Sequence, residues 1–222
     1  MLKKDLNLLW ILIVVILVSC KQNNPEDLVS ESRFKDLLDV TQYVNPFVGT
    51  KNMGHTFPGA TTPFGMVQLS PETNSQPYIK DGKYNPRTYE YCSGYQYADS
   101  TIFGFSHTHF SGTGHSDLGD FLVMPTIGEL ILEPGSVNEE NSGYHSDFSH
   151  KNENAEPGYY KVKLDDYNIK AELTASDRVG FHQYTFPKSE DSHVILDLIS
   201  NIYNNDSKNV CTFVRVENDS MI

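Results

Sequence analysis

Residues 159–175 read YYKVKLDDYNIKAELTA, and this stretch decides the fold. Apolar residues alternate with polar ones over positions 160–164 and again over positions 169–175. Successive side chains of a β-strand point to opposite faces of a sheet, so a period of two predicts a strand with one buried face. The stretch therefore predicts two consecutive strands, Tyr159–Leu164 and Ile169–Ala175.

Further short apolar or alternating runs lie on both sides of this stretch. Strands that recur about every 8 to 15 residues, with turn signals between them and no repeated helical period, favour an antiparallel sandwich over an α/β fold. The run HVILDLI is apolar nearly throughout, which indicates a strand covered on both faces. The predicted fold class is all-β, a supersandwich-like antiparallel β-sandwich with long functional loops. Its other expected strands are Gly65–Ser70, Phe121–Pro125, Gly128–Leu132, Val179–Phe186, His193–Ile199 and Val210–Val216.

The first 20 residues have the layout of an export signal. Lys3 and Lys4 precede an unbroken apolar run, Leu8–Val18, which is too short to span a bilayer as a mature helix. The run ends in LVSC, which resembles the lipobox of bacterial lipoproteins, whose cysteine becomes the lipidated first residue. We expect a lipoprotein signal peptide at 1–19, lipidation of Cys20 and a lipid-anchored place in the cell envelope, on the outer membrane or the periplasmic face. A plain signal peptide or an uncleaved anchor is the alternative.

The mature chain is expected to have two parts. Residues 20–40 hold the lipidated cysteine, a polar tether and a lead-in helix around Glu31–Asp39. Residues 41–222 form the β-sandwich domain. Within it, Gly49–Gly119 is punctuated by Gly, Pro, Asn and Ser, which predicts a long loop region. Long ordered loops in compact domains are more often functional than decorative.

Composition excludes some partners and suits others. The formal net charge of −12 argues against nucleic acid or an anionic membrane surface, because both require a basic face. The 13 Tyr and 12 Phe suit β-structure and stacking on sugar rings. Beyond Cys20 there are two cysteines, Cys92 and Cys211, and their spacing leaves open whether they pair.

Chemistry-bearing residues gather in FSHTHFSGTGHSD at residues 105–117. One interpretation is a metal site, because His107 and His109 point the same way on a strand; His115 and Asp117 would complete it. Another is a serine nucleophile with a histidine base, although no G-x-S-x-G elbow is present. A third is a purely structural turn. The fourth is a polar ligand loop, in which two glycines admit a ligand and mixed donors and acceptors suit sugar hydroxyls.

Several blocks of the sequence resemble the N-terminal domain of glycoside hydrolase family 92, the exo-acting, calcium-dependent α-mannosidases common in Bacteroidetes. They appear in the family's order and cover nearly the whole mature chain. The blocks are YVNPFVGT (43–50), GHTFPGATTPFGMVQLSPET (54–73), YCSGYQYAD (91–99), IFGFSHTHFSGTGHSDLGDFLVMPTIGEL (102–130) and EPGYYKVKLDDYNIKAELTASDRVGFHQYTFP (156–187).

The resemblance implies a β-sandwich followed by a helical (α/α)₆ barrel. Such enzymes remove terminal α-mannose with inversion, using two carboxylates spaced to admit a water molecule. The resemblance places both carboxylates, and the ligands of a sugar-engaging calcium ion, in the barrel. We therefore assign no catalytic and no metal-binding residue in this chain. We expect the chain to be truncated before the barrel and inactive alone, with an exposed apolar face that the barrel would cover.

The resemblance also implies that loops of this domain line the sugar pocket. This sequence departs from the family's pattern at two places, KNM before the GHT block and RTYE before YCSGY. These departures leave the preferred mannose linkage open. The expected partners are an α-mannose-containing glycan, the helical barrel and a membrane reached through the lipid. The expected substrate-binding residues are His107, His109, Ser111, Gly112, Thr113, Gly114, His115, Asp117, Tyr91, Cys92, Gly94, Tyr95, Gly54, His55 and Phe57.

Two alternatives to a mannosidase domain remain open. One is a non-catalytic, glycan-binding surface lipoprotein, and the other is a nonfunctional remnant of a frameshifted gene. The DNA downstream of the codon for Ile222 distinguishes these hypotheses. A reading frame for the barrel there would support a mannosidase domain or a frameshifted remnant, whereas intergenic sequence would favour the glycan-binding lipoprotein.

Overall fold

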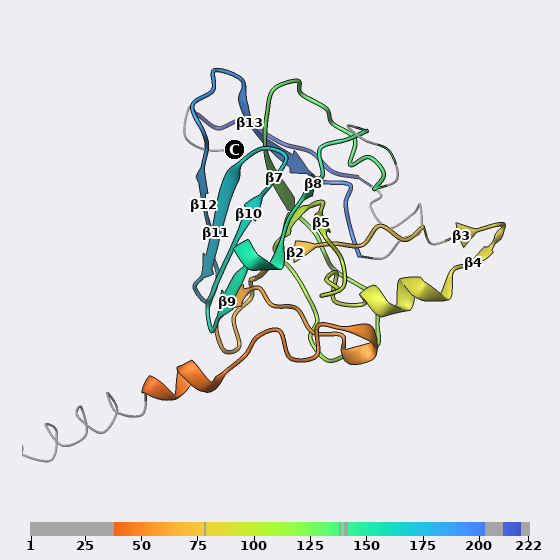
Figure 1. Ribbon diagram of the computed structural model, residues 1–222, viewed down its shortest axis with the longest axis vertical. Coiled ribbons are helices and arrows are strands. Elements are labelled where there is room, and N and C mark those ends of the chain that lie inside the picture. Colours follow the sequence, from red (N-terminus) through yellow and green to blue (C-terminus); the bar gives the residue numbers. More distant parts are fainter. Residues whose placement is uncertain (1–37, 78, 138, 140–141, 203–210, 219–222) are drawn as a thin grey trace, which may run out of the picture. The chain divides into compact units, whose positions relative to one another are not determined.

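The computed structural model describes residues 38–77, 79–137, 139, 142–202 and 211–218 of the chain (Figure 1). The chain divides into two compact units, Met1–Tyr43 and Val44–Ile222. In the first unit only the 3₁₀-helix η1, Leu38–Tyr43, is described. The predicted signal peptide, Cys20 and the tether lie outside the described residues, and so does all of the predicted lead-in helix except its last two positions. None of the described helices is long and apolar enough to cross a membrane.

One sheet of the second unit contains the two strands predicted from residues 159–175. Its strand order is β12-β11-β10-β9, and every pairing in it is antiparallel. The pairing of β10 with β11 runs from Tyr159 opposite Thr174 to Leu164 opposite Ile169. Figure 1 shows β10, β11 and β12 side by side in cyan and blue. The strands are β9 (Asn154–Glu156), β10 (Tyr159–Leu164), β11 (Ile169–Ala175) and β12 (Gly180–Thr185).

The other large sheet has five strands in the order β1-β2-β6-β7-β13. These pairings are also antiparallel, so the sheet is assembled from segments far apart in sequence. The strands are β1 (Ala60–Thr61), β2 (Gln68–Glu72), β6 (Gly104–Ser106), β7 (Leu122–Ile127) and β13 (Ser192–Asp197).

Short elements complete the described fold. A hairpin turns at Asp81 and Gly82, which both have positive φ, as a tight two-residue hairpin turn requires. The hairpin strands are β3 (Ile79–Lys80) and β4 (Lys83–Tyr84), and a second pair is β5 (Thr101–Ile102) with β8 (Ser146–Asp147). The 3₁₀-helices are η2 (Asn52–Gly54), η3 (Pro86–Tyr91) and η4 (His150–Asn152).

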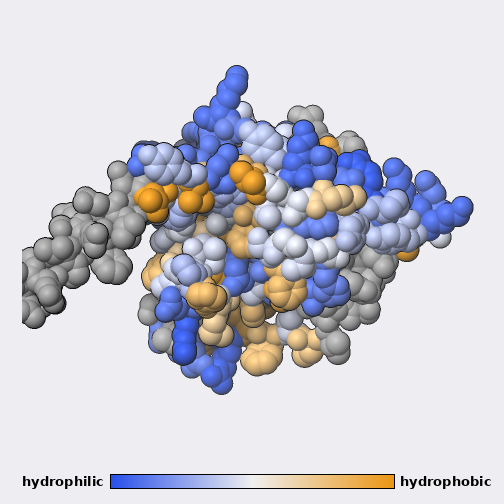
Figure 2. Space-filling model, turned by 90° about the horizontal axis from the view of Figure 1, so that it is seen from below, coloured by the Kyte–Doolittle hydropathy of each residue, from blue (hydrophilic) through white to orange (hydrophobic). Residues whose placement is uncertain are grey.

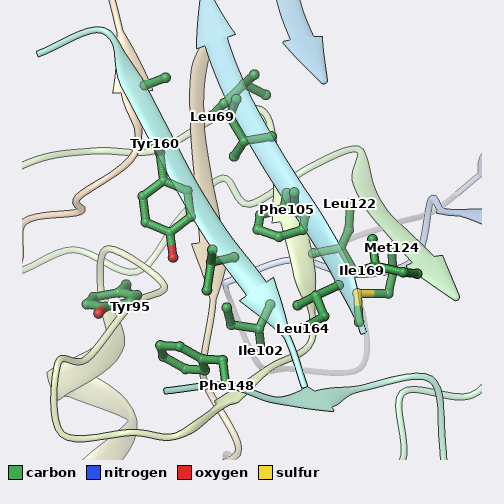
Figure 3. Packing of buried hydrophobic residues seen from close by; sticks show 14 of the residues in the cluster. Leu69, Tyr95, Ile102, Phe105, Leu122, Met124, Phe148, Tyr160, Leu164 and Ile169 are labelled. Carbon is green, nitrogen blue, oxygen red and sulfur yellow. The ribbon is translucent and has the colours of Figure 1, made fainter. Parts of the chain in front are cut away.

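The core lies between the two large sheets. Leu69, Phe105 and Leu122 from the five-stranded sheet belong to one buried cluster with Tyr160 and Ile169 of the four-stranded sheet (Figure 3). Burying one such side chain fully contributes about 1.5–3 kcal/mol. The inward positions of β10 and β11 are those that the alternation predicted: the side chains at 160, 162, 164, 169, 171 and 173 are buried. The predicted all-β antiparallel sandwich is confirmed.

Three predicted segments differ from the structure. Gly128–Leu132 forms no strand; Gly128 has a φ of 91°, and Leu132 is 68% exposed. Cys211–Val216 forms no strand either, and Val210 lies outside the described residues. His193–Ile199 does supply a strand, but the prediction that both faces are covered is wrong. Ile195 is 8% exposed and faces the core, whereas Val194 is 58% and Leu196 43% exposed, because they point to the opposite face of the sheet, away from the core between the sheets.

The described surface carries hydrophobic side chains at several places. On the face shown in Figure 2 they lie among hydrophilic ones. Large exposed side chains are present on β13 and on residues 211–218, among them Val194, Leu196, Phe213 and Val216. The two described cysteines are free thiols; Cys92 is buried and Cys211 is exposed.

Candidate functional site

Three predicted site segments, 54–57, 91–95 and 105–117, meet around His55. The backbone N–H of Gly112 donates to the His55 carbonyl at 2.6 Å, and the Ser93 hydroxyl donates to the same oxygen. The His55 ring stands edge-on to Tyr89 with 4.9 Å between centroids. A Cβ atom at residue 114 would lie 2.0 Å from the Tyr89 hydroxyl oxygen, so only glycine lets the loop pack against this ring.

The tip of the 105–117 segment is open to solvent. Residues 110–115 are all exposed, and Tyr89 beside them is 42% exposed. Gly112 has a φ of 72° and no atom within 4 Å of the position of a Cβ, so this glycine serves the turn and leaves open space above it. Ser111, Thr113 and His115 therefore present exposed polar side chains on a loop whose Gly114 packs against the partly exposed Tyr89 ring.

His109 lies at the buried base of the same segment. Its Nδ1 is 2.7 Å from the Gln68 carbonyl, and its Nε2 is 2.8 Å from Glu72 Oε1 and 3.0 Å from Ser106 Oγ. The Ser106 hydroxyl also donates to Glu72 Oε1. Because the carbonyl only accepts, Nδ1 carries a proton. The serine hydroxyl proton serves the contact between Oγ and Oε1. The contact between Nε2 and Oε1 joins two acceptors unless one of them carries a further proton. The cluster is a polar anchor that ties the segment to β2.

This anchor does not form a nucleophilic triad. In a catalytic triad the acid binds one ring nitrogen of the histidine and the serine binds the other. Here both Glu72 and Ser106 contact Nε2, and Nδ1 faces a backbone carbonyl. His109 is 4% exposed and Ser106 fully buried, so neither side chain reaches a substrate in this chain.

His107 binds a different set of partners from His109. Its Nδ1 is 2.6 Å from the Phe121 carbonyl, and its Nε2 is 3.1 Å from Nε2 of His182 on β12. Burial lowers the pKa of His107, which favours the neutral ring. Across the described ranges, no three His, Cys, Asp or Glu side chains gather closely enough to hold a metal ion.

Residues 43–222 match the sequence model of the glycosyl hydrolase family 92 N-terminal domain. The chain belongs to glycosyl hydrolase family 92. The resemblance seen in the sequence blocks is thereby confirmed, and the match covers both large sheets and all three segments of the site.

Solved structures of family 92 enzymes are similar to this domain. The α-mannosidase BT3965 from Bacteroides thetaiotaomicron, solved with mannoimidazole, is 46% identical with a TM-score of 0.65, over 72% of this chain and 20% of BT3965. The inverting mannosidase BT2199 from the same species is 31% identical with a TM-score of 0.53, over 71% of this chain and 19% of BT2199. An uncharacterized secreted glycosidase of Arthroderma benhamiae is 32% identical over 151 residues, which are 67% of this chain and 18% of that protein. The chain thus spans about a fifth of the length of these relatives.

The remaining predicted site residues of the family 92 domain are mostly buried. The Tyr91 hydroxyl donates to Asp99 at 3.1 Å and the Tyr95 hydroxyl to Glu153 at 3.0 Å; burial and these carboxylates raise the pKa of both phenols. Both rings are about fully covered, at 1% exposure, so they pack in the interior and offer no face to a sugar. Figure 3 shows Tyr95 among the core side chains near Tyr160, whose hydroxyl also donates to Glu153.

One cysteine, two glycines and one carboxylate of the family 92 domain shape the site segments. Cys92 Sγ contacts the Tyr89 carbonyl at 3.1 Å and Ser116 Oγ at 3.3 Å, and burial raises the pKa of this thiol. A Cβ at residue 94 would lie 2.0 Å from Glu72 Oε2, and a Cβ at residue 54 would lie 2.0 Å from the Gly49 carbonyl oxygen. Asp117 accepts from the Leu118 N–H at 2.8 Å. These residues hold backbone in place.

Phe57, the last predicted residue, contacts the buried anchor. Its ring centroid is 5.0 Å from that of His109. Glu72 and Tyr89 were not among the expected site residues, although both lie in the site. No clear sequence signal marked Glu72, because its neighbours in SPET at 70–73 are serine, proline and threonine, among which a carboxylate is not unusual.

Proposed function

We propose that this family 92 domain lines the sugar pocket of an exo-α-mannosidase that removes terminal α-mannose from glycans. The observation that carries the proposal is the exposed polar loop 110–115, held by the His109 anchor at its base and packed on Tyr89 and His55. Its hydroxyl and imidazole groups both donate and accept, as sugar hydroxyls do, and an exposed tyrosine face suits a pyranose ring. The relatives named above as an α-mannosidase and an inverting mannosidase support the choice of sugar.

The proposal leaves the chemical step to a helical barrel. Family resemblance supplies the two carboxylates and the calcium ion there. The His55 ring favours a polar ligand or water near the loop as its partner. Its Nε2 is buried and has no hydrogen-bond partner among the described residues. We further propose that the domain is tethered to the cell envelope through Cys20.

The test separates binding from catalysis. The full chain, incubated with α-mannobiosides and calcium, should release no mannose; appreciable release would contradict the assignment of catalysis to the barrel. Saturation-transfer NMR with methyl α-mannoside should show weak contact with the chain. Thr113→Ala together with His115→Ala should reduce that contact several-fold, whereas Ser189→Ala, distant in sequence, should not. An unchanged signal in the double variant would contradict the role of the loop.

A further inference from the structure

A row of four hydrogen-bonding groups links the two large sheets near the start of residues 107–120, the segment between β6 and β7 that carries the exposed loop. It runs from the Phe121 carbonyl to His107 Nδ1 at 2.6 Å, from His107 Nε2 to His182 Nε2 at 3.1 Å, and from His182 Nδ1 to the Tyr184 hydroxyl at 2.7 Å. His182 and Tyr184 lie on β12 of the four-stranded sheet. His107 directly follows β6 of the five-stranded sheet.

The Phe121 carbonyl at one end of this row fixes which atom donates in each of its hydrogen bonds. A carbonyl only accepts, so the proton of neutral His107 sits on Nδ1 and its Nε2 accepts. His182 must then donate from Nε2, which leaves its Nδ1 to accept from the Tyr184 hydroxyl. With both rings neutral, every nitrogen in the pair has one partner of the correct kind.

The surroundings of the pair favour neutral rings. Burial lowers the pKa of His182 to about 4, and the His107 charge acts the same way. Burial also lowers the pKa of His107; the hydrogen bond to the Phe121 carbonyl acts in the opposite direction, and the charge of His109 lowers the pKa further. His182 lies opposite the apolar Leu173 in the β11–β12 pairing. The nearby carboxylates are engaged elsewhere, Glu72 with His109 and Asp120 with Thr108.

We propose that His107 and His182 form an acid-sensitive clamp between β12 and the base of the 107–120 segment. One added proton leaves the clamp closed, because the Tyr184 hydroxyl rotates and accepts from His182 Nδ1. A second proton places two N–H groups and two positive charges face to face at the Nε2 contact, and the clamp opens. This inference does not rest on the mannosidase proposal.

Opening would act on a defined set of backbone contacts. The His107 N–H donates to the Asp120 carbonyl, the Gln68 N–H donates to the His107 carbonyl, and the Gly119 N–H donates to the Thr108 carbonyl. All three pin the two ends of the segment that carries the exposed loop. Loss of the clamp should therefore loosen this base before the sandwich core unfolds.

Histidine tautomers in the full chain provide the first test. In the ¹⁵N-histidine-labelled protein at pH 7, long-range ¹H–¹⁵N correlation should show His107 protonated on Nδ1 and His182 on Nε2. The opposite tautomer in either ring would overturn the clamp. This measurement needs no variant, so it decides the matter even if substitutions prevent folding.

Amide exchange between pH 7 and pH 3, corrected for the intrinsic rate, provides the second test. Protection of the Gln68, His107 and Gly119 amides should fall by about tenfold or more in the acid step, equivalent to about 1.4 kcal/mol. Amides of β10 and β11 serve as the control for global unfolding and should stay protected. His182→Phe should abolish the step. His193→Phe should retain it, because the His193 ring contacts the Gly128 carbonyl and, among the described residues, takes no part in the clamp. An equal step in His182→Phe, or none in the unmodified chain, would overturn the clamp.

Discussion

At the scale of single residues, His182 makes the stability of the domain depend on pH. Its pKa of about 4 in the folded chain, set by burial and then by His107, lies below the value of about 6.5 for an unfolded histidine. The unfolded chain therefore binds more protons in this window, and the stabilisation present above about pH 6.5 is lost as the pH falls towards 4.

The size of this loss is at most about 3.5 kcal/mol, since the pKa falls from about 6.5 to about 4 and each unit of pKa difference corresponds to about 1.4 kcal/mol. Urea unfolding at pH 7 and pH 4.5 measures it. The His182→Phe variant should lose less free energy of unfolding between these pH values than the unmodified chain, and His193→Phe should lose the same as the unmodified chain. Identical losses in both variants would show that His182 is not responsible.

Two glycines with similar backbone angles should respond very differently to alanine. Gly94 and Gly112 have φ of 77° and 72°, but only at Gly94 would a Cβ collide, with Glu72 Oε2. Gly112→Ala should cost about 1 kcal/mol from the left-handed backbone alone. Gly94→Ala should cost more than about 2 kcal/mol, because the buried carboxylate of the anchor must also move.

Thermal or urea unfolding of the two variants measures the difference. Equal destabilisation would mean that Glu72 yields without cost, and the anchor would then be less rigid than the geometry indicates.

The directions of the site histidines could not be predicted from their spacing. His107 and His109 are two apart, and on a strand they would share a face. However, β6 ends at Ser106, so the period of two no longer applies beyond it. One histidine turns to β12 and the other to β2, and those partners are distant in sequence. The residue types identified the segment, whereas long-range contacts decide what each side chain does.

At the scale of elements, alternation was enough where both strands of a pair are adjacent in sequence. The β10–β11 pair and its inward face follow directly from YYKVKLDDYNIKAELTA. For β13 the apolar run predicted the strand but not its exposed face, because an apolar run alone does not show that the rest of the fold covers only one face of the strand. The apolar run 128–132 has no strand partner in the described chain, and apolar character alone could not reveal this.

Adjacent positions on β13 should therefore differ in their sensitivity to truncation. Ile195→Ala should lower the free energy of unfolding by about 2–4 kcal/mol, because Ile195 packs in the core cluster opposite Met124. Val194→Ala should change it by no more than about 0.5–1 kcal/mol, since Val194 is mostly exposed. Urea unfolding of both variants gives the comparison, and a larger cost at Val194 would contradict the assigned face.

At the scale of the whole molecule, the chain combines a family 92 domain with a predicted lipid anchor. The family match begins at residue 43, beyond the predicted signal and tether. Because a lipidated cysteine is the proposed attachment, Cys20→Ala should move the protein out of the membrane fraction when it is expressed in a lipoprotein-processing bacterium. Fractionation followed by immunoblotting measures this. Retention of Cys20→Ala in membranes would rule out lipidation as the anchor.

The β3–β4 hairpin offers a way to learn which side of a membrane the domain occupies. Asp81 and Gly82 form its turn, a Cβ at residue 82 would meet no atom within 4 Å, and Figure 1 shows the hairpin extending away from both large sheets. A short epitope inserted between these two residues should therefore leave the sandwich intact. Antibody labelling of intact cells would then report whether the hairpin faces the medium, without any change to the sugar loop or the clamp.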